Sequence, residues 1–276
     1  MKVISTVAGV REELLSVAHP VGLVPTMGAL HRGHASLVER ARSENPTVVS
    51  TIFVNPRQFG PSEDFTAYPR PVEDDLAMLE KAGADIVFTP GTDEIYPPGF
   101  DTYVDCGKLT ERLEGKSRPG HFRGVATVVT KLLSIVRPDR AYFGQKDAQQ
   151  CMVIKKLNAD LNLGVDIVIC PTVREPDGLA MSSRNRYLNP QERAAAPVLF
   201  RSLRFASELG ISDAEEVRRR MRALIEQEPL AKIDYVSIAD PDTLEELDRL
   251  DGRPALVSLA VRIGKTRLID NVTIGQ

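Results

Sequence analysis

Two histidines, His31 and His34, lie in residues 25–34, whose sequence is PTMGALHRGH. The apolar run 21–24 before them predicts a buried strand, and the amphipathic segment 34–44 predicts a helix. A helix start offers unpaired backbone N–H groups and the positive end of the helix dipole, so it binds anions such as phosphates. Glycines beside the histidines let a ligand approach the backbone closely. We therefore expect a phosphate site here, where the histidines donate hydrogen bonds to charge that develops during a reaction.

A second polar segment, residues 144–150, has the sequence GQKDAQQ, follows a strand-like run and opens a predicted helix. Lys146 can place an ammonium group on a triphosphate. Asp147 can cap the helix or contact a ribose or an amine. Gln150 can hydrogen-bond a polar substrate. The alternative interpretation of this segment is a capped, solvent-exposed helix start.

A third segment, residues 175–185, has the sequence EPDGLAMSSRN. Ser182 and Ser183 can donate to phosphate oxygens, and Arg184 can bind them in a bidentate manner. The alternative is a polar loop between domains. No Ser–His–Asp arrangement accompanies the serines, so neither is interpreted as a nucleophile.

Two amides, Asn55 and Gln58, follow the strand-like run 47–54 and suit a small, hydroxylated substrate. For Asn55, the turn chemistry of Asn-Pro is an alternative explanation. The Gly-rich basic loop 114–124 either helps to hold phosphates or a carboxylate, or is a plain surface loop.

Acidic residues at 73–75 open another predicted helix, where favourable interaction with the helix dipole is their expected role. The less favoured interpretation is a magnesium site at Asp74 and Asp75, because Mg²⁺ takes carboxylate oxygens alongside nucleotide phosphates.

Strands and helices must alternate to position these segments. Strands are predicted over residues 21–26, 47–54, 84–89, 102–106, 140–144 and 165–170, and helices over 10–18, 34–44, 72–82, 125–136 and 148–161. This alternation predicts an α/β fold, a doubly wound parallel sheet of Rossmann-like type. Ligands of such sheets bind at the carboxyl ends of the strands, where the polar loops 25–34, 55–70 and 145–147 would gather.

The pattern changes after residue 171. Helices are predicted over 190–209, 213–228 and 244–250, and strands over 233–239, 254–263 and 266–269, which indicates a second, smaller α+β domain. We therefore expect a domain of residues 1–172 and a C-terminal domain of residues 173–276.

Composition excludes some classes of function. The 276 residues carry a formal net charge of −3, which gives no general attraction to nucleic acid or to an anionic membrane. The N-terminus lacks a signal-peptide pattern, and no apolar run is long enough to span a bilayer. Three cysteines without metal-ligand spacing fit a reduced, cytoplasmic compartment.

Four segments in this order together resemble the pantoate–β-alanine ligase family: residues 25–34, 53–59, 144–150 and 181–185. The match continues over essentially the whole chain, including residues 235–241. This family belongs to the nucleotidylyl transferase superfamily, which shares the HxGH element with class I aminoacyl-tRNA synthetases.

The resemblance implies a Rossmann-like N-terminal domain, a smaller C-terminal lid domain and a homodimer. It implies that (R)-pantoate, β-alanine and ATP, with Mg²⁺, give pantothenate, AMP and diphosphate through a pantoyl adenylate. His34 would be the catalytic histidine and proton donor, and His31 would assist the phosphates. Charge on the triphosphate would be stabilised by Lys146, Ser182, Ser183 and Arg184.

The resemblance also assigns binding residues. Gln58 and Gln150 would hold pantoate, and Gln58 would also contact β-alanine. Asp74 and Asp75 are the candidate magnesium positions. The ATP site would be lined by Met27, Gly28, Ala29, Leu30, His31, Arg32, Gly33, His34, Gly144, Gln145, Lys146, Asp147, Val173, Met181, Ser182, Ser183 and Arg184.

Two rival functions share parts of this pattern. A plain nucleotidyltransferase also uses an HxGH junction but does not require Gln58 and Gln150 to face a small hydroxy acid. A non-catalytic nucleotide- or RNA-binding module is the other rival. The acidic balance argues against RNA, and the intact histidine pair argues against a loss of catalysis.

Overall fold

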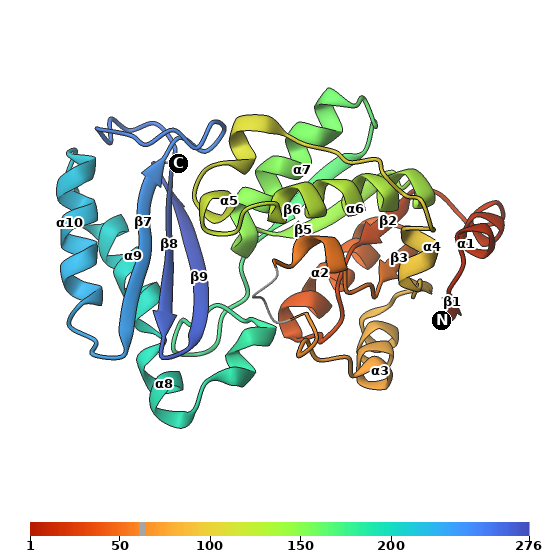
Figure 1. Ribbon diagram of the computed structural model, residues 1–276, viewed down its shortest axis with the longest axis horizontal. Helices are drawn as coiled ribbons and strands as arrows, with labels where there is room; N and C mark the ends of the chain where they lie inside the picture. The colour runs from red at the N-terminus through yellow and green to blue at the C-terminus, as the bar shows by residue number, and fades with distance from the viewer. Residues whose placement is uncertain (61–64, 276) are drawn as a thin grey trace. The chain divides into compact units, whose positions relative to one another are not determined.

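The computed structural model describes residues 1–60 and 65–275, so part of the loop expected over residues 55–70 lies outside the described residues. The chain divides into two compact units (Figure 1). The first, called here the N-terminal unit, comprises Met1–Gly144 and Gln149–Pro171. The second, the C-terminal unit, comprises Gln145–Ala148 and the chain from Thr172 onward.

The N-terminal unit is built on a parallel sheet with the strand order β1-β4-β3-β2-β5-β6. Leu23 of the central strand β2 pairs with Val49 of β3 on one side and with Ala141 of β5 on the other. The chain winds outward from β2 through β3 and β4, then returns to β5 and β6, so the order reverses between β2 and β5. The strands are β1 (Lys2–Ile4), β2 (Val21–Val24), β3 (Thr47–Thr51), β4 (Ile86–Phe88), β5 (Arg140–Gly144) and β6 (Asp166–Cys170).

Helices cover both faces of this sheet (Figure 1). The apolar side of α2, with Leu37, Val38 and Ala41, packs with Val48 of β3 and Leu79 of α3 in one buried cluster. The helices are α1 (Val7–Leu14), α2 (Arg32–Glu44), α3 (Val72–Ala82), α4 (Thr92–Ile95), α5 (Glu114–Ser117), α6 (His121–Val136) and α7 (Ala148–Asp160), with 3-10 turns η1 (Pro56–Gln58) and η2 (Gly107–Thr110).

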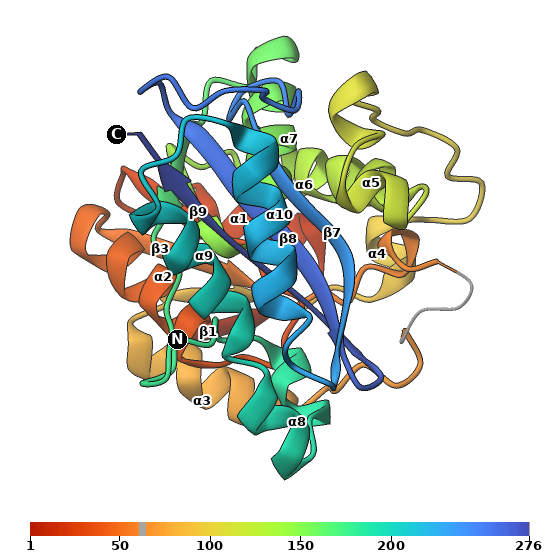
Figure 2. The same cartoon turned by 90° about the vertical axis from the view of Figure 1, so that its left-hand side faces the viewer.

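The C-terminal unit is an antiparallel sheet with the order β7-β8-β9, covered on one face by helices α9 and α10 (Figure 2). Leu203 of α9 and Met221 of α10 are fully buried against Val257 and Leu259 of β8. The elements are η3 (Gln145–Asp147), η4 (Ser183–Tyr187), α8 (Pro190–Ala195), α9 (Val198–Glu208), α10 (Ala214–Ile225), β7 (Ala231–Ala239), β8 (Ala255–Ile263) and β9 (Thr266–Ile274).

The predicted fold class, a Rossmann-like doubly wound sheet with a smaller α+β unit, is confirmed. The strand predicted over 102–106 is wrong. Residues 102–106 join neither sheet, and Val104 N–H donates to the side-chain hydroxyl Oγ1 of Thr127 of α6 (3.0 Å) instead of to a neighbouring strand.

Two helix predictions in the C-terminal unit also need correction. Pro197 lacks a backbone N–H and separates α8 from α9 within the helix predicted over 190–209. The segment 244–250 is not a helix, because Leu244 adopts a left-handed φ of 56°. Bridges join Ala239 to Glu246 and Asp213 to Arg249 there instead.

Among the described residues, no helix combines the length and the apolar character that a membrane crossing requires.

Candidate active site

The loop between β2 and α2 holds the HxGH element at the point where the strand order reverses. Gly28 and Ala29 adopt left-handed φ angles of 81° and 51° in succession. This bend turns the N–H groups of Ala29 and Leu30 onto the carboxylate of Asp75, at 2.8 Å and 2.7 Å. A Cβ at Gly28 would lie 2.8 Å from Asp75 Oδ2, so the bend also requires a glycine for space. The loop is therefore a fixed structure held from α3.

This anchoring gives Asp75 a different role from a magnesium ligand. Its side chain is 1% exposed, and each carboxylate oxygen accepts a backbone N–H. Asp74 next to it is exposed. No group of three or more His, Cys, Asp or Glu that could hold a metal occurs among residues 1–60 and 65–275. The pair Asp74 and Asp75 does not fit a metal site, because the anchoring hydrogen bonds already use the buried carboxylate.

The two histidines cap the start of α2. Nδ1 of His31 accepts the N–H of Gly33 at 3.1 Å, and Nδ1 of His34 accepts the N–H of His31 at 3.3 Å, which forms a reciprocal capping box. The ring centroids lie 4.1 Å apart. An imidazole whose Nδ1 accepts carries its proton on Nε2. Both rings therefore present an Nε2–H donor beside a helix N-terminus, which suits a phosphate.

Gln58 is held at the end of η1 by Asn55, which is 1% exposed. Asn55 Nδ2 donates to Gln58 Oε1 (3.0 Å) and to the carbonyl of Gly124 (3.1 Å). Its Oδ1 accepts from Arg57 N–H (3.2 Å) and from the hydroxyl of Tyr96 (2.8 Å). Because this set uses every donor and acceptor of the amide, Asn55 is a positioning residue rather than the substrate-binding residue that we expected.

Helix α6 packs tightly behind Gln58. A Cβ at Gly124 would lie 2.1 Å from the carbonyl oxygen of Arg57, so only glycine permits this approach. His121 Nδ1 lies 2.8 Å from the carbonyl oxygen of Gln58, and its Nε2 lies 3.1 Å from Arg118. The basic loop 114–124 thus supports the Gln58 backbone, a role that its composition does not reveal.

Two adjacent glutamines on α7 have opposite roles. Gln149 is buried, accepts the N–H of Glu114 (3.0 Å) and donates to the carbonyls of Leu109 (2.7 Å) and Arg112 (2.8 Å). Within the described part of the chain, no hydrogen bond involves the half-buried amide of Gln150. Gln149 holds the preceding loop, and Gln150 is the one available to a ligand.

The C-terminal unit carries the other predicted residues. Lys146 Nζ lies 3.4 Å from Asp147 Oδ1, on the 3-10 turn η3 that follows β5. Met181 N–H donates to the carbonyl of Val173 (3.0 Å), so these two expected ATP-lining residues lie side by side. Ser182 caps η4, because its Oγ accepts the N–H of Arg184 at 3.3 Å. A single compact unit thus contains Lys146, Asp147, Val173, Met181, Ser182, Ser183 and Arg184.

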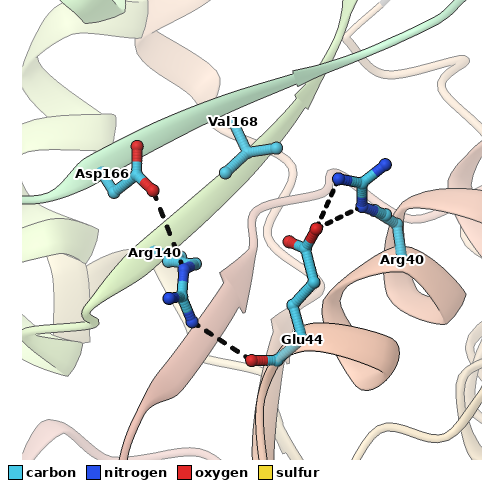
Figure 3. A pocket seen from close by; sticks show the side chains of 5 residues that line it. All are labelled: Arg40, Glu44, Arg140, Asp166 and Val168. Carbon is cyan, nitrogen blue, oxygen red and sulfur yellow. Dashed lines mark hydrogen bonds and ion pairs between the residues drawn. The ribbon is translucent and has the colours of Figure 1, made fainter.

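A polar cavity of about 400 Å³ lies elsewhere in the N-terminal unit (Figure 3). It is lined by Arg40, Glu44, Arg140, Asp166 and Val168. Arg140 and Asp166 begin their strands and Glu44 ends α2, so the cavity is at the amino ends of the strands, away from the HxGH loop. None of the predicted site residues lines it. Its charges are paired: Arg40 with Glu44, and Arg140 with Asp166 at 3.7 Å.

Sequence reasoning missed the residues that hold the site. These are Asp75 as an anchor, Tyr96 and His121 behind Gln58, Gln149, and Asn271 of β9, which is described below. The HxGH spacing and the chemistry of lysine or serine point to a ligand. A supporting amide or carboxylate has no such signature, because its partners are backbone groups far away in sequence.

A parallel sheet of Rossmann-like order, with a histidine pair capping the helix after the central strand, defines an α/β enzyme class that binds a nucleotide at its switch point. The family model for pantoate–β-alanine ligase matches residues 2–273 of this chain. The pantothenate synthetase of Roseiflexus sp. (strain RS-1) is 60% identical over 277 residues, which cover 99% of each chain.

Two solved structures are also similar. The pantothenate synthetase of Thermus thermophilus gives a TM-score of 0.93 at 49% identity, over 99% of each chain. The pantoate–β-alanine ligase of Francisella tularensis, solved in complex with β-γ ATP and β-alanine, gives a TM-score of 0.82 at 37% identity over 99% of this chain and 97% of that one. The chain belongs to the pantoate–β-alanine ligase family.

Proposed function

We propose that the residues described above divide the work of one reaction, the ATP-dependent condensation of (R)-pantoate with β-alanine. As a member of its family, the chain is a pantoate–β-alanine ligase that forms pantothenate, AMP and diphosphate. The observation that carries our assignment of roles is the capping geometry of His31 and His34, in which each Nδ1 accepts a backbone N–H, so that the proton of each ring is on Nε2.

In the first step, a carboxylate oxygen of pantoate attacks the α-phosphorus of ATP, and the bond from that phosphorus to the bridging oxygen of diphosphate breaks. His34 donates to the phosphate oxygens as charge develops, and His31 assists it. Lys146, Ser182, Ser183 and Arg184 stabilise the departing diphosphate. Donors that are already oriented before the reaction stabilise this charge most effectively, and the capping box supports such an arrangement.

In the second step, the neutral amine of β-alanine attacks the acyl carbon of pantoyl adenylate. AMP leaves with the electron pair of the broken C–O bond, and the nitrogen loses one proton to solvent as the amide forms. Gln58 and Gln150 hold pantoate by its polar groups, and Gln58 also contacts β-alanine. The fixed orientation of Gln58 and the available amide of Gln150 support these roles. No covalent intermediate with the enzyme is needed.

The remaining residues of the expected ATP site line the nucleotide. Mg²⁺ accompanies ATP as the counterion of its phosphates and is not held by protein side chains.

The N-terminal unit binds pantoate, and the C-terminal unit acts as a lid that excludes water from the acyl adenylate. The protein is a homodimer that works in the cytoplasm. Scattering with and without ATP and pantoate tests the lid, and sedimentation velocity tests the dimer.

Incubation of the purified protein with ATP, Mg²⁺ and (R)-pantoate, with and without β-alanine, tests the reaction by mass spectrometry. We expect pantoyl adenylate without β-alanine, and pantothenate and AMP only with it. Binding of ATP with no turnover of pantoate would contradict the ligase reaction and favour a nucleotidyltransferase or a non-catalytic module.

A further inference from the structure

The turn that carries Lys146 is held by one side chain from the far end of the chain. Asn271 of β9 is 4% exposed and forms three hydrogen bonds with this turn. Its Nδ2 donates to the carbonyls of Gln145 (3.0 Å) and Lys146 (2.9 Å), and its Oδ1 accepts from Gln145 Nε2 (3.2 Å). We propose that Asn271 is a positioning residue for the adenylation step, because it fixes the backbone from which Lys146 projects. This inference rests on the proposed role of Lys146.

The turn needs such support because of its geometry. η3 is a single 3-10 turn between β5 and α7, and 3-10 turns have weaker internal hydrogen bonds than α-helices. Holding two consecutive carbonyl groups fixes the orientation of the peptide planes on both sides of Lys146. The long lysine side chain amplifies any rotation at its Cα, so a small backbone shift moves the ammonium group far.

Asn271 is itself fixed by a buried ion pair. Asp270 is 2% exposed and forms a bidentate pair with Arg174, with N–O distances of 2.6 Å and 3.0 Å. Asp270 Oδ1 also accepts the N–H of Asn271 (2.8 Å), and Arg174 Nη2 lies 3.4 Å from the Asn271 carbonyl oxygen. Both backbone groups of Asn271 therefore contact the same ion pair.

The same arginine also organises the segment that leads to the serines. Arg174 forms an isolated antiparallel β-bridge with Ala180, and its Nη1 donates to the carbonyl of Gly178 (3.1 Å). Its guanidinium stacks on Phe200, 4.1 Å from the ring centroid. One hydrogen-bond network around Arg174 and Asp270 thus contacts both the Asn271 that holds the turn of Lys146 and the segment 178–180 that precedes Ser182. It explains why residues 145–148 group with the C-terminal unit although they lie between a strand and a helix of the N-terminal unit in sequence.

The substitution Asn271→Asp tests the inference. The carboxylate has the same shape but cannot donate to the two carbonyl oxygens, so Lys146 should lose its fixed position. We expect pantoate-dependent exchange of diphosphate into ATP to slow by about 10- to 100-fold, the effect of leaving buried polar groups unpaired. Amide formation from supplied pantoyl adenylate and β-alanine should be nearly unchanged, because diphosphate has already left. Equal slowing of both half-reactions would mean general structural damage and would overturn the proposal.

A matched control is Asn45→Asp in the N-terminal unit. Asn45 is 3% exposed, and its Nδ2 likewise donates to a carbonyl, that of Ala41, and to the hydroxyl of Tyr142, both at 2.7 Å. We expect this variant to lose thermal stability without changing the ratio of the two half-reactions. A changed ratio would show that any buried Asn→Asp substitution has this effect, which would overturn the specific role of Asn271.

A double-mutant cycle tests directly whether Asn271 acts through Lys146. If Asn271 acts through Lys146, adding Asn271→Asp to Lys146→Met should slow diphosphate exchange little further, whereas independent effects would multiply. Multiplied effects would overturn the proposal. The outcomes also separate it from the proposed function. A wild-type protein that makes no pantothenate contradicts the function, whereas a slow Lys146→Met beside a normal Asn271→Asp contradicts only this inference.

Discussion

The two units differ in the kind of side chain that each carries at the proposed substrate-binding positions. The N-terminal unit carries neutral donors, the imidazoles of His31 and His34 and the amides of Gln58 and Gln150, at or near helix starts beside a parallel sheet. The C-terminal unit offers the cations Lys146 and Arg184 with two hydroxyls, on short turns beside an antiparallel sheet. Neutral amides suit a hydroxy acid, and cations suit a triphosphate. Under the proposed roles, adenylation uses side chains of both units, whereas recognition of pantoate uses side chains of the N-terminal unit alone.

The largest effect is expected for His34→Ala. Loss of one donor to a developing phosphate charge should slow turnover by about 100- to 1,000-fold. ATP binding should be largely kept, because the other contacts of the nucleotide remain. Steady-state kinetics and ATP titration measure the two effects. The exposed His19→Ala is the control with normal turnover, and a normal rate for His34→Ala would contradict the assigned role.

Asp75→Asn separates an anchor from a metal ligand. The amide cannot accept both N–H groups of Ala29 and Leu30, so the free energy of unfolding should fall by about 1–3 kcal/mol. The concentration of Mg²⁺ that gives half-maximal activity should stay the same. Thermal melts and magnesium titrations measure both quantities. A shifted magnesium requirement with normal stability would restore the metal interpretation.

His31 caps α2 and is proposed as a donor to the phosphates, and two substitutions separate these roles. His31→Asn keeps a capping acceptor, whereas His31→Ala loses it and should be about 1 kcal/mol less stable than His31→Asn. Both lose the Nε2–H donor, so both should lose activity equally. Unequal activity at a temperature where both variants are folded would show that His31 acts mainly through the cap.

Tyr142→Phe tests a contact outside the proposed site. Tyr142 hydrogen-bonds Glu44, one of the residues that line the cavity of Figure 3. The hydroxyl donates to Glu44 Oε2 (2.7 Å), and burial, with a further contribution from Glu44, raises the pKa of Tyr142 to about 12. A raised folded pKa means that this contribution to stability is complete below pH 10 and is lost as the pH rises toward 12. The variant should therefore lose less stability than the wild type over that range, at unchanged activity. An equal loss of unfolding free energy in the variant and the wild type between about pH 10 and pH 12, or reduced activity of the variant, would contradict this account.

The sequence predicts the elements that bear strong patterns and the residues that bear reactive groups. The parallel sheet follows from alternating runs, and the HxGH junction follows from a strand, a turn and a helix in succession. Supporting contacts could not be predicted. Asp75 lies 46 residues from Ala29 and Asn271 lies 126 residues from Gln145, and neither pairing has a local pattern. Gln149 and Gln150 are the same residue type side by side, and only the folded loop around Leu109 distinguishes them.

The division of labour between the units is tested most directly by equilibrium titration of a non-hydrolysable ATP analogue and of (R)-pantoate against wild type, Lys146→Met and Gln150→Leu. We predict that Lys146→Met raises the dissociation constant of the ATP analogue by about 10- to 100-fold, the effect of losing a hydrogen bond to a charged group. The dissociation constant of pantoate should stay unchanged. Gln150→Leu should raise the dissociation constant of pantoate by about 5- to 10-fold and leave that of the ATP analogue unchanged. If each variant weakened the binding of both ligands equally, or if the effects were exchanged, the assignment of Lys146 to the phosphates and of Gln150 to pantoate would be wrong.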